Sequence, residues 1–403
     1  MPTNSALSKP LELTSYASAA SSTDRFAKIE QRVDQLRFGF FGEIGGLLAA
    51  LKKVSRDDLL ETDTQVAAEE IGDALWYLFA TADALNVRTE NLAVECLRIL
   101  RERLDECDRP TPAPLTFRQI DGLVSVHPQG EAQRSLLLGE LAKTSGEFVH
   151  GALPPNAQDD TTACKKLANL LAQLALVSST FRLPLEKIAE SNLEKIKGRW
   201  PGKDPEYKNL FDDCFLEHEK LPRELRIEFI ERGDTDSRHV VQRLSNVYIG
   251  DRLTDNSHEQ DDYRFHDVFH LAYVAHLGWS PVIRALLKVK RKSRPEIDER
   301  EDGARAMIIE EGIATWIFNH AKPRKHYEGI AEGKLDYSLL KQVQSMVRGY
   351  EVDKCPLWQW EKAILEGFRV FRELCKPENR GGTVVVDMIN HTLQFESSSK
   401  TQA

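Results

Sequence analysis

The sequence predicts a mainly α fold, in which two helical modules in tandem precede a mostly helical α+β domain with a small antiparallel sheet. Over about the first half of the chain, apolar residues recur at the three- and four-residue steps of amphipathic helices. From about residue 205 the composition changes, and short segments alternate between apolar and polar residues as strands do. The 403 residues exceed one average domain, so two or three domains are expected.

The domain organisation follows from changes in composition along the chain. Residues 1–22 are rich in Ser, Ala and Thr with little periodicity, which predicts a disordered tail. Three prolines between Asp108 and Pro114 indicate a linker. After the tail, the expected parts are a helical module over 23–107, a Pro-rich linker over 108–118, a second module over 119–204, an α+β domain over 205–397 and a short tail over 398–403.

The composition argues against several classes of protein. The net charge of −9 argues against a nucleic-acid binder and against binding to anionic membranes. No apolar run reaches the roughly 18 residues of a membrane span, and the N-terminus lacks the basic-then-apolar plan of a signal peptide. The six cysteines include no C-x-x-C pair, so we expect reduced thiols in a cytoplasmic protein.

The first module is expected to contain helices near 24–36, 38–54, 64–85 and 89–106. The two central helices are the part around which the rest of the chain is organised. Their predicted apolar stripes are Phe41, Ile44, Leu48 and Leu51 on the first helix, and Leu75, Leu78, Ala82 and Leu85 on the second.

Each central helix also carries acidic residues beside strongly apolar sequence. Glu70 and Asp73 are three residues apart and share a helical face, and Glu43 faces them if the helices pack antiparallel. Like charges at close range raise each other's pKa and repel, a cost that a hard divalent cation removes. The alternative is that the three acids are ordinary solvated residues on amphipathic helices.

The segments GEIGG (42–46) and EEIGDALWYL (69–78) resemble the MazG-type all-α nucleoside triphosphate pyrophosphohydrolases. The resemblance implies a helical bundle in which Glu-x-x-Glu and Glu-x-x-Asp bind Mg²⁺. Glu43, Glu70 and Asp73 fall on three of these four positions, and the fourth is Gly46 here. The resemblance therefore makes these three acids the catalytic and metal-binding residues, with Mg²⁺, or Mn²⁺ in its place, as the cofactor.

The second module looks like a degenerate copy of the first. The segment around Glu140 resembles the segment around Glu43, and the later helices also match. In that alignment a cation, Lys166, and an amide, Asn169, replace the second acid pair. The copy is therefore not expected to hold Mg²⁺ in the manner of the family.

The last helix of the second module carries an amide and a cation that the first module lacks at the equivalent places. Asn192, Lys195 and Arg199 lie at three- and four-residue steps, on one helical face. This stretch resembles the family's C-terminal helix, whose Asn and Lys face the nucleotide, whereas the first module has Cys96 and Ile99 at the equivalent places. We therefore expect an intramolecular pseudo-dimer with a single composite site. The alternative is that the cations are surface charge on a closing helix.

The resemblance implies hydrolysis of a nucleoside triphosphate to the monophosphate and pyrophosphate. The substrate-binding candidates are Asn192, Lys195, Arg199 and, as a weaker one, Lys52. Glu69 points about 100° away from Glu70 around the helix and is expected to be solvated. No Gly-rich Walker loop is present, which argues against a P-loop ATPase.

The α+β domain resembles the C-terminal domain attached to some MazG-like proteins. We expect strands over 226–232, 383–388 and 391–396, and helices near 260–277, 280–290, 302–320, 337–349 and 357–374. The basic run over 288–294 is expected to be a solvated face, with a phosphate or partner patch as the alternative.

One helix of this domain could carry chemistry of its own. His266 and His270 are four residues apart on one helical face, with Asp267 beside them. Glu310 or Glu311 could add a carboxylate, giving a set that suits a transition metal. The alternative is a helix whose histidines hydrogen-bond buried acids.

Three functions remain open. An active pyrophosphohydrolase is favoured by the intact Glu70-Ile-Gly-Asp73. A nucleotide sensor that has lost turnover is favoured by Gly46. A metal-dependent phosphohydrolase would be centred on the histidine helix of the α+β domain. No motif specifies the preferred base or sugar, and a homodimer or higher homo-oligomer is compatible with the sequence.

Overall fold

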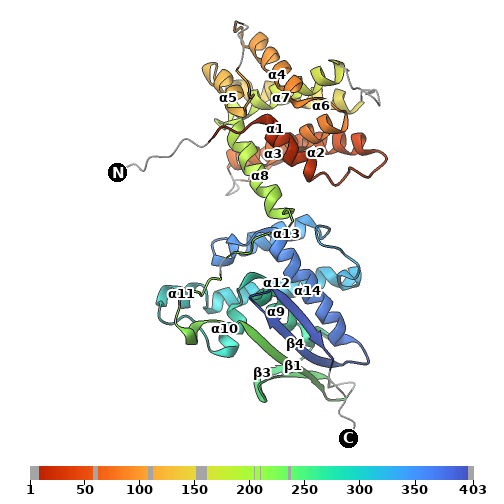
Figure 1. Ribbon diagram of the computed structural model, residues 1–403, viewed down its shortest axis with the longest axis vertical. Helices are drawn as coiled ribbons and strands as arrows, with labels where there is room; N and C mark the ends of the chain where they lie inside the picture. The colour runs from red at the N-terminus through yellow and green to blue at the C-terminus, as the bar shows by residue number, and fades with distance from the viewer. Residues whose placement is uncertain are drawn as a thin grey trace. The chain divides into compact units, whose positions relative to one another are not determined.

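The computed structural model describes residues 9–57, 62–107, 112–150, 161–203, 205–208, 210–234 and 237–397. The chain divides into two compact units, residues 1–197 and 198–403, which are described one at a time (Figure 1). Within the described ranges the fold is mainly α-helical, with a five-stranded antiparallel sheet in the second unit, as predicted. No helix in these ranges is long and apolar enough to cross a lipid bilayer.

The first unit is built from two blocks of four helices in the same order. The first block is α1 (Leu13–Ser22), α2 (Arg32–Asp57), α3 (Asp63–Ala84) and α4 (Thr89–Arg103), and the second is α5 (Phe117–Val126), α6 (Glu131–His150), α7 (Thr161–Thr180) and α8 (Leu185–Arg199). The first helices of the two blocks have 10 residues each and the last helices 15 each. This correspondence is what a tandem repeat predicts.

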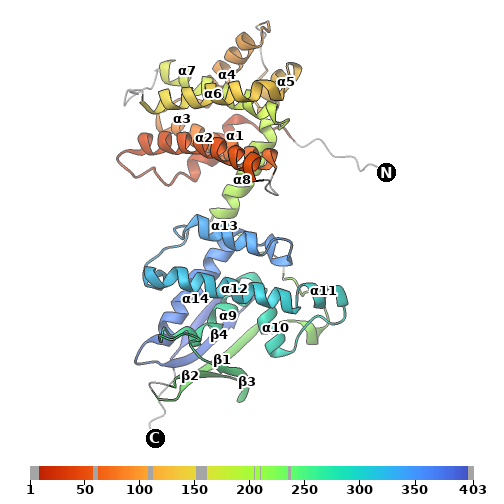
Figure 2. The ribbon, with the colours of Figure 1, turned by 180° about the vertical axis from the view of Figure 1, so that it is seen from behind.

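Helices of one block pack on helices of the other. Helix α2 contacts α6, and both α3 and α4 contact α7 (Figure 2). The segments that precede α1 and α5 form a reciprocal bridge. In it, Leu13 N donates to Leu115 O at 3.1 Å, and Phe117 N donates to Leu11 O at 3.0 Å. Each block thus covers the other, as the two subunits of a symmetric dimer would.

Helix α1 corrects the predicted disordered tail. Residues 13–22 are helical, and Leu13, Tyr16 and Ala20 are buried in the core of the first unit. These three residues follow the three- and four-residue steps of an amphipathic helix, but the Ser- and Ala-rich composition concealed so short a stripe. Residues 1–8 and 398–403, also predicted as tails, lie outside the described residues.

The apolar stripe predicted for the first central helix is wrong at two of its four positions, Phe41 and Leu48, and correct at Ile44. Phe41 is 45% exposed and Leu48 is 37% exposed, whereas Phe40, Ile44 and Leu47 are buried. Both sets have helical spacing, so periodicity alone could not choose between them. The stripe predicted for α3 is confirmed, since all four of its residues are buried.

The helix predicted over 24–36 begins only at Arg32, where α2 starts. Residues 24–31 form turns instead. Asp24 holds these turns, because its carboxylate accepts from Phe26 N at 2.7 Å and from Arg32 Nε at 2.7 Å. Such local bonds from an Asp side chain compete with helix formation.

In the second unit the sheet has the strand order β3-β2-β1-β4-β5. Its strands are β1 (Glu224–Arg232), β2 (His239–Leu244), β3 (Val247–Leu253), β4 (Gly381–Asp387) and β5 (Thr392–Glu396). The helices are α9 (Asp267–Leu277), α10 (Pro281–Leu287), α11 (Pro295–Arg300), α12 (Ala304–Ala321), α13 (Tyr337–Met346) and α14 (Leu357–Cys375). The predicted strands and helices of this domain are confirmed, although the helix expected from residue 260 begins at Asp267.

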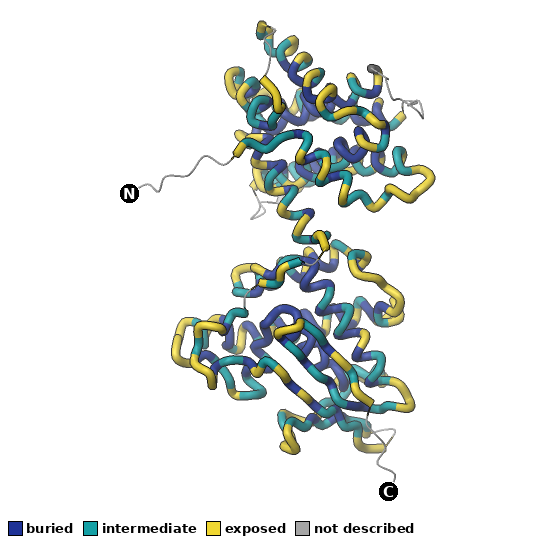
Figure 3. The backbone as a smooth tube through the Cα atoms, in the orientation of Figure 1, coloured by how far each residue is buried: buried dark blue, intermediate teal, exposed yellow. Residues whose placement is uncertain are grey.

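Helices α9 and α14 form the centre of the second unit. Every residue of α9 is buried, and α14 adds Trp360 and Phe368 to the same core. Alternate residues of β1, namely Leu225, Ile227 and Phe229, point into this core from the sheet. Figure 3 shows the buried positions of the unit in dark blue.

The β2–β3 hairpin is an element that the sequence patterns missed. Its turn residues Ser245 and Asn246 have φ values of 47° and 66°, as in a type I′ turn. That turn is usually marked by Asn-Gly or Asp-Gly, so Ser-Asn is a weak signal. Strand β3 has no buried residue, which removes the alternation that marks a strand. The short helix α11 was missed as well.

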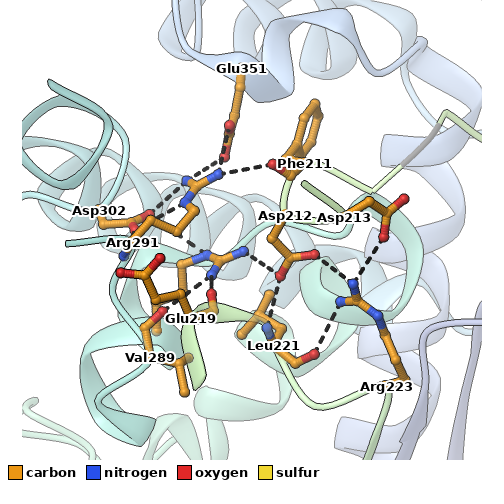
Figure 4. A network of polar contacts seen from close by, with 11 residues as sticks. Phe211, Asp212, Asp213, Glu219, Leu221, Arg223, Val289, Arg291, Asp302 and Glu351 are labelled. Carbon is orange, nitrogen blue, oxygen red and sulfur yellow. Dashed lines mark hydrogen bonds and ion pairs between the residues drawn. The ribbon is translucent and has the colours of Figure 1, made fainter. Parts of the chain in front are cut away.

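Buried ion pairs join distant segments of the second unit (Figure 4). Arg284 donates to Asp212 Oδ2 at 2.7 Å, and Arg291 donates to Asp302 Oδ1 at 2.7 Å. Each of these four side chains is at most 1% exposed. The prediction that the basic run 288–294 is a solvated face is therefore wrong for Arg291, whose buried guanidinium requires a partner.

Candidate functional site

Three helices of the first unit bring the predicted residues together. Helix α2 carries Glu43, α3 carries Glu70 and Asp73, and α8 carries Asn192 and Lys195. Helices α2 and α3 pack along each other. Glu43 is hydrogen-bonded to Glu70 and lies within electrostatic reach of Asp73, so the acids of the two helices face each other as predicted.

Two glycines allow this close arrangement. A Cβ atom at Gly72 of α3 would lie 3.2 Å from the Cβ of Asn192, so α8 approaches the backbone of α3. A Cβ atom at Gly46 of α2 would lie 2.5 Å from Glu70 Oε2. The Glu70 carboxylate therefore fills the space beside Gly46, the position at which the family pattern has its fourth acid.

Asp73 is held by two residues of α8. Asn192 Nδ2 donates to Asp73 Oδ1 at 3.0 Å. Lys195 Nζ donates to Oδ1 and Oδ2 of Asp73 at 2.8 and 2.6 Å. Lys195 Nζ also lies 3.4 Å from Oε1 of Glu69, which is 43% exposed. The amide and the cation of the second block thus meet an acid of the first.

Tyr16 of α1 supports the site and was missed by the sequence patterns. Its hydroxyl donates to Asn192 Oδ1 at 2.7 Å, and its ring packs edge-on against Phe79 and Phe117. Both partners of this bond are buried, at 0% and 4% exposure. Because Tyr16 binds the amide oxygen, the amide nitrogen of Asn192 is directed at Asp73. A single Tyr in a Ser- and Ala-rich segment was the only signal in the sequence.

Glu43 of this cluster resists ionisation. Partial burial, together with the negative charges of Asp73 and Glu70, raises the pKa of Glu43 to about 8, although Lys195 opposes the shift. Burial and the charges of Glu43 and Asp73 also raise the pKa of Tyr77 to about 12. One ammonium group therefore does not balance the negative charge in this volume.

The donor set fits a hard divalent cation. Mg²⁺ binds carboxylate oxygens and keeps positions open for water or phosphate. A cation among Glu43, Glu70 and Asp73 would remove the repulsion that raises the pKa of Glu43. Because Lys195 contacts both oxygens of Asp73, Lys195 and a cation would compete for that carboxylate.

Two predicted substrate-binding residues are not joined to this cluster. Arg199 belongs to the second unit, where its guanidinium is 2% exposed, pairs with Glu361 and donates to Leu335 O at 2.8 Å. Its predicted phosphate-binding role is therefore corrected, because buried partners already bind it. Lys52 is exposed on α2, and no described contact links it to the acids, so its role stays a prediction.

In the second block, an arginine contacts the residues that correspond to the acid cluster of the first block. Arg103 of α4 lies 3.4 Å from Glu140 Oε2 and 3.2 Å from Asn169 Oδ1. In the alignment of the two blocks, Glu140 corresponds to Glu43 and Asn169 to Asp73. A guanidinium thus pairs with the remaining acid of the copy at a partly exposed position.

The comparison with known protein families concerns the second unit. Residues 206–399 match the family model of the MazG C-terminal domain. These residues form a MazG-type C-terminal domain. The match spans the sheet and helices α9 to α14, and it indicates a nucleotide-related function. No curated protein and no solved structure matches it.

The MazG-type domain contains the second predicted set of site residues. His266, Asp267 and His270 lie together at the start of α9, with exposures of 7%, 8% and 0%. Glu310 Oε1 lies 2.8 Å from His270 Nδ1, whereas Glu311 Oε2 faces the other ring nitrogen at 3.5 Å. Of the two candidate carboxylates, Glu311 faces the cluster, whereas Glu310 contacts the opposite ring nitrogen of His270 and lies outside it.

Proposed function

We propose that the first unit of this chain is a Mg²⁺-dependent nucleoside triphosphate pyrophosphohydrolase. The observation that carries the proposal is the contact of Asn192 and Lys195 with Asp73. It joins the amide and the cation of one block to the acids of the other. A nucleoside triphosphate suits such a mixed site, because its phosphates can bind both an ammonium group and a carboxylate-bound metal ion.

In the proposed reaction, the oxygen of a water molecule bonds to the α-phosphorus. The bond between the α-phosphorus and the oxygen that bridges to the β-phosphorus breaks. The products are the nucleoside monophosphate and pyrophosphate, which leaves with the bridging oxygen. Held by Glu43, Glu70 and Asp73, Mg²⁺ would lower the pKa of a bound water molecule and neutralise phosphate charge.

The residues of α8 would bind the substrate. Lys195 would exchange Asp73 for a phosphate oxygen, leave Asp73 to the metal, and stabilise the charge that develops on pyrophosphate. Asn192 would donate from its amide nitrogen to a sugar or phosphate oxygen. Tyr16 would keep this nitrogen directed into the site through the bond to the amide oxygen.

A nucleotide sensor without turnover is the second candidate. Gly46 at the position of the fourth acid favours it, as does the ion pair between Lys195 and Asp73. Both features reduce the number of carboxylate oxygens that are available to Mg²⁺. Such a sensor would bind the triphosphate and release no pyrophosphate.

An assay of the purified full-length protein separates the two functions. The protein is incubated with Mg²⁺ and a panel of ribo- and deoxynucleoside triphosphates, and pyrophosphate is measured. Glu70→Gln should reduce its release at least about 100-fold, a typical loss for one charge-stabilising group. Glu90→Gln, at an exposed position of α4, should leave it unchanged. Full activity of Glu70→Gln would reject the proposed site. Nucleotide binding without pyrophosphate release by the wild type would indicate the sensor.

A further inference from the structure

The start of α9 in the second unit gathers metal-ligating side chains that the proposed hydrolase does not use. One ligand atom each from His266, Asp267 and His270 lie within 4.8 Å of one another. The two histidines are four residues apart, so they project from the same face of the chain as it enters α9. All three side chains are largely buried.

Both imidazoles are held so that Nε2 faces the cluster. His266 Nδ1 lies 2.9 Å from the carbonyl oxygen of Tyr263, which can only accept, so this nitrogen carries the proton. His270 Nδ1 lies 2.8 Å from Glu310 Oε1. Glu310 also accepts from Ser280 Oγ at 2.6 Å, so Nδ1 of His270 is a donor as well. When Nε2 of such a ring carries no proton, its lone pair is available as a ligand.

The groups opposite these nitrogens are also acceptors. His266 Nε2 lies 3.1 Å from Asp267 Oδ1 and 4.0 Å from Glu311 Oε2. His270 Nε2 lies 3.5 Å from the same oxygen of Glu311. Lone pairs that converge in this way repel one another unless a proton or a metal ion lies between them.

His270 Nε2 is the independent sign of a missing ligand. It is fully buried and has no hydrogen-bond partner among the described residues. Leaving a buried polar atom unsatisfied costs about 1–3 kcal/mol. A bond to a metal ion would satisfy this atom without moving the ring.

A second layer of contacts orients the carboxylate as well. Gln242 Nε2 of β2 donates to Asp267 Oδ2 at 2.8 Å, which leaves Oδ1 directed at His266. The ring of Tyr263 stacks on His266 with centroids 4.4 Å apart. Histidines and carboxylates that bind metals are typically fixed by such outer contacts.

We propose that His266, Asp267, His270 and Glu311 bind one divalent transition-metal ion through two imidazole nitrogens and two carboxylate oxygens. This donor set suits Zn²⁺, Co²⁺, Mn²⁺ or Fe²⁺ rather than Mg²⁺. Tetrahedral ligands at bond lengths near 2.1 Å lie about 3.4 Å apart, which is close to the separations between the nitrogens and oxygens here. The side chain of Glu311 is 44% exposed, so the ion would lie close to solvent on that side.

The test measures metal binding by the full-length protein. The protein is stripped with a chelator and loaded with Zn²⁺ or Co²⁺, passed through a desalting column, and analysed for bound metal and for the visible spectrum of Co²⁺. We expect about one equivalent of metal and a Co²⁺ spectrum typical of nitrogen and oxygen ligands. His270→Ala should lose both, and Glu311→Gln should bind at least tenfold more weakly while keeping its fold, since its side chain is half exposed.

Two control variants show whether the bound metal lies at this site. His276→Gln removes another buried histidine of α9, whose Nε2 contacts Glu366 at 2.9 Å, and should retain the metal. Glu70→Gln should also retain it, which makes the result independent of the proposed hydrolase site. A wild-type protein that binds neither ion would overturn the proposal. So would metal retention by His270→Ala and Glu311→Gln equal to that of His276→Gln.

Discussion

Glu43 shows how the fold changes the chemistry of a single side chain. Its pKa is about 8, compared with 4.5 for an ordinary glutamate. The folded protein therefore binds this proton more tightly than the unfolded chain does. The resulting contribution to stability is complete below about pH 4.5 and is lost as the pH rises through about 8.

We therefore predict that the melting temperature of the metal-free protein falls by a few degrees between pH 5 and pH 8. Glu43→Gln should show a smaller fall, because its neutral amide does not ionise. The difference between the two melting curves isolates Glu43 from other titrating groups. At pH 8, Mg²⁺ should stabilise the wild type more than Glu43→Gln. Parallel melting curves for both proteins across this pH range would count against the acid cluster.

Gly46 provides a second test at the scale of one residue. A methyl group there would meet the Glu70 carboxylate at 2.5 Å, so Gly46→Ala should displace Glu70 and weaken Mg²⁺-dependent activity. Gly45→Ala has nothing within 4 Å of the new atom. It should preserve activity and stabilise the helix by about 0.5–1 kcal/mol. Equal activity of the two variants would show that the position of Glu70 is unimportant.

Lys195 is predicted to have opposite effects on metal binding and on catalysis. Lys195→Met removes the ammonium group that competes for Asp73, so Mg²⁺ should bind more tightly in the absence of nucleotide. The value of kcat/KM for the triphosphate should fall about 100- to 1,000-fold, because a group that stabilises phosphate charge is lost. Lys197→Met, on the exposed side of the same helix, is the matched control. Calorimetry and steady-state kinetics report the two effects separately.

At the scale of one element, α1 contributes to the site through Tyr16, which binds Asn192. Tyr16→Phe removes the hydroxyl that binds Asn192 and leaves a buried amide oxygen without that donor. We expect a loss of about 1–3 kcal/mol in the free energy of unfolding and a raised KM. Tyr16→Leu should cost more, because it also removes the ring contacts with Phe79 and Phe117. Denaturant unfolding compares the two variants, and a stability of Tyr16→Phe equal to wild type would contradict this role.

Some elements could be predicted from the sequence because their patterns had one interpretation. The stripe of α3 and the alternation of Leu225, Ile227 and Phe229 in β1 are of this kind. On α2, Phe40 and Phe41 gave two stripes of equal periodicity, and only packing against the other helices selected Phe40. Strand β3 lacked any buried face, so its pairing with β2 was the only feature that defines it as a strand.

At the scale of the whole molecule, the proposed site takes its acids from one block and its amide and cation from the other. The residues that meet in the first unit, Asp73 with Asn192 and Lys195, were predicted from their complementary losses in the two modules. Tyr16 could not be predicted, because its role depends on a contact across 176 positions of sequence. The predicted role of Arg199 was wrong because spacing places a residue on a helical face without showing which partner binds it.

The origin of the oxygen in the products tests the central claim most directly. The full-length protein is incubated in water enriched in ¹⁸O with Mg²⁺ and a nucleoside triphosphate that it cleaves. The products are then analysed by mass spectrometry. Attack at the α-phosphorus predicts one ¹⁸O atom in the nucleoside monophosphate and none in pyrophosphate. Label in pyrophosphate, or the release of inorganic phosphate and a nucleoside diphosphate, would contradict the account.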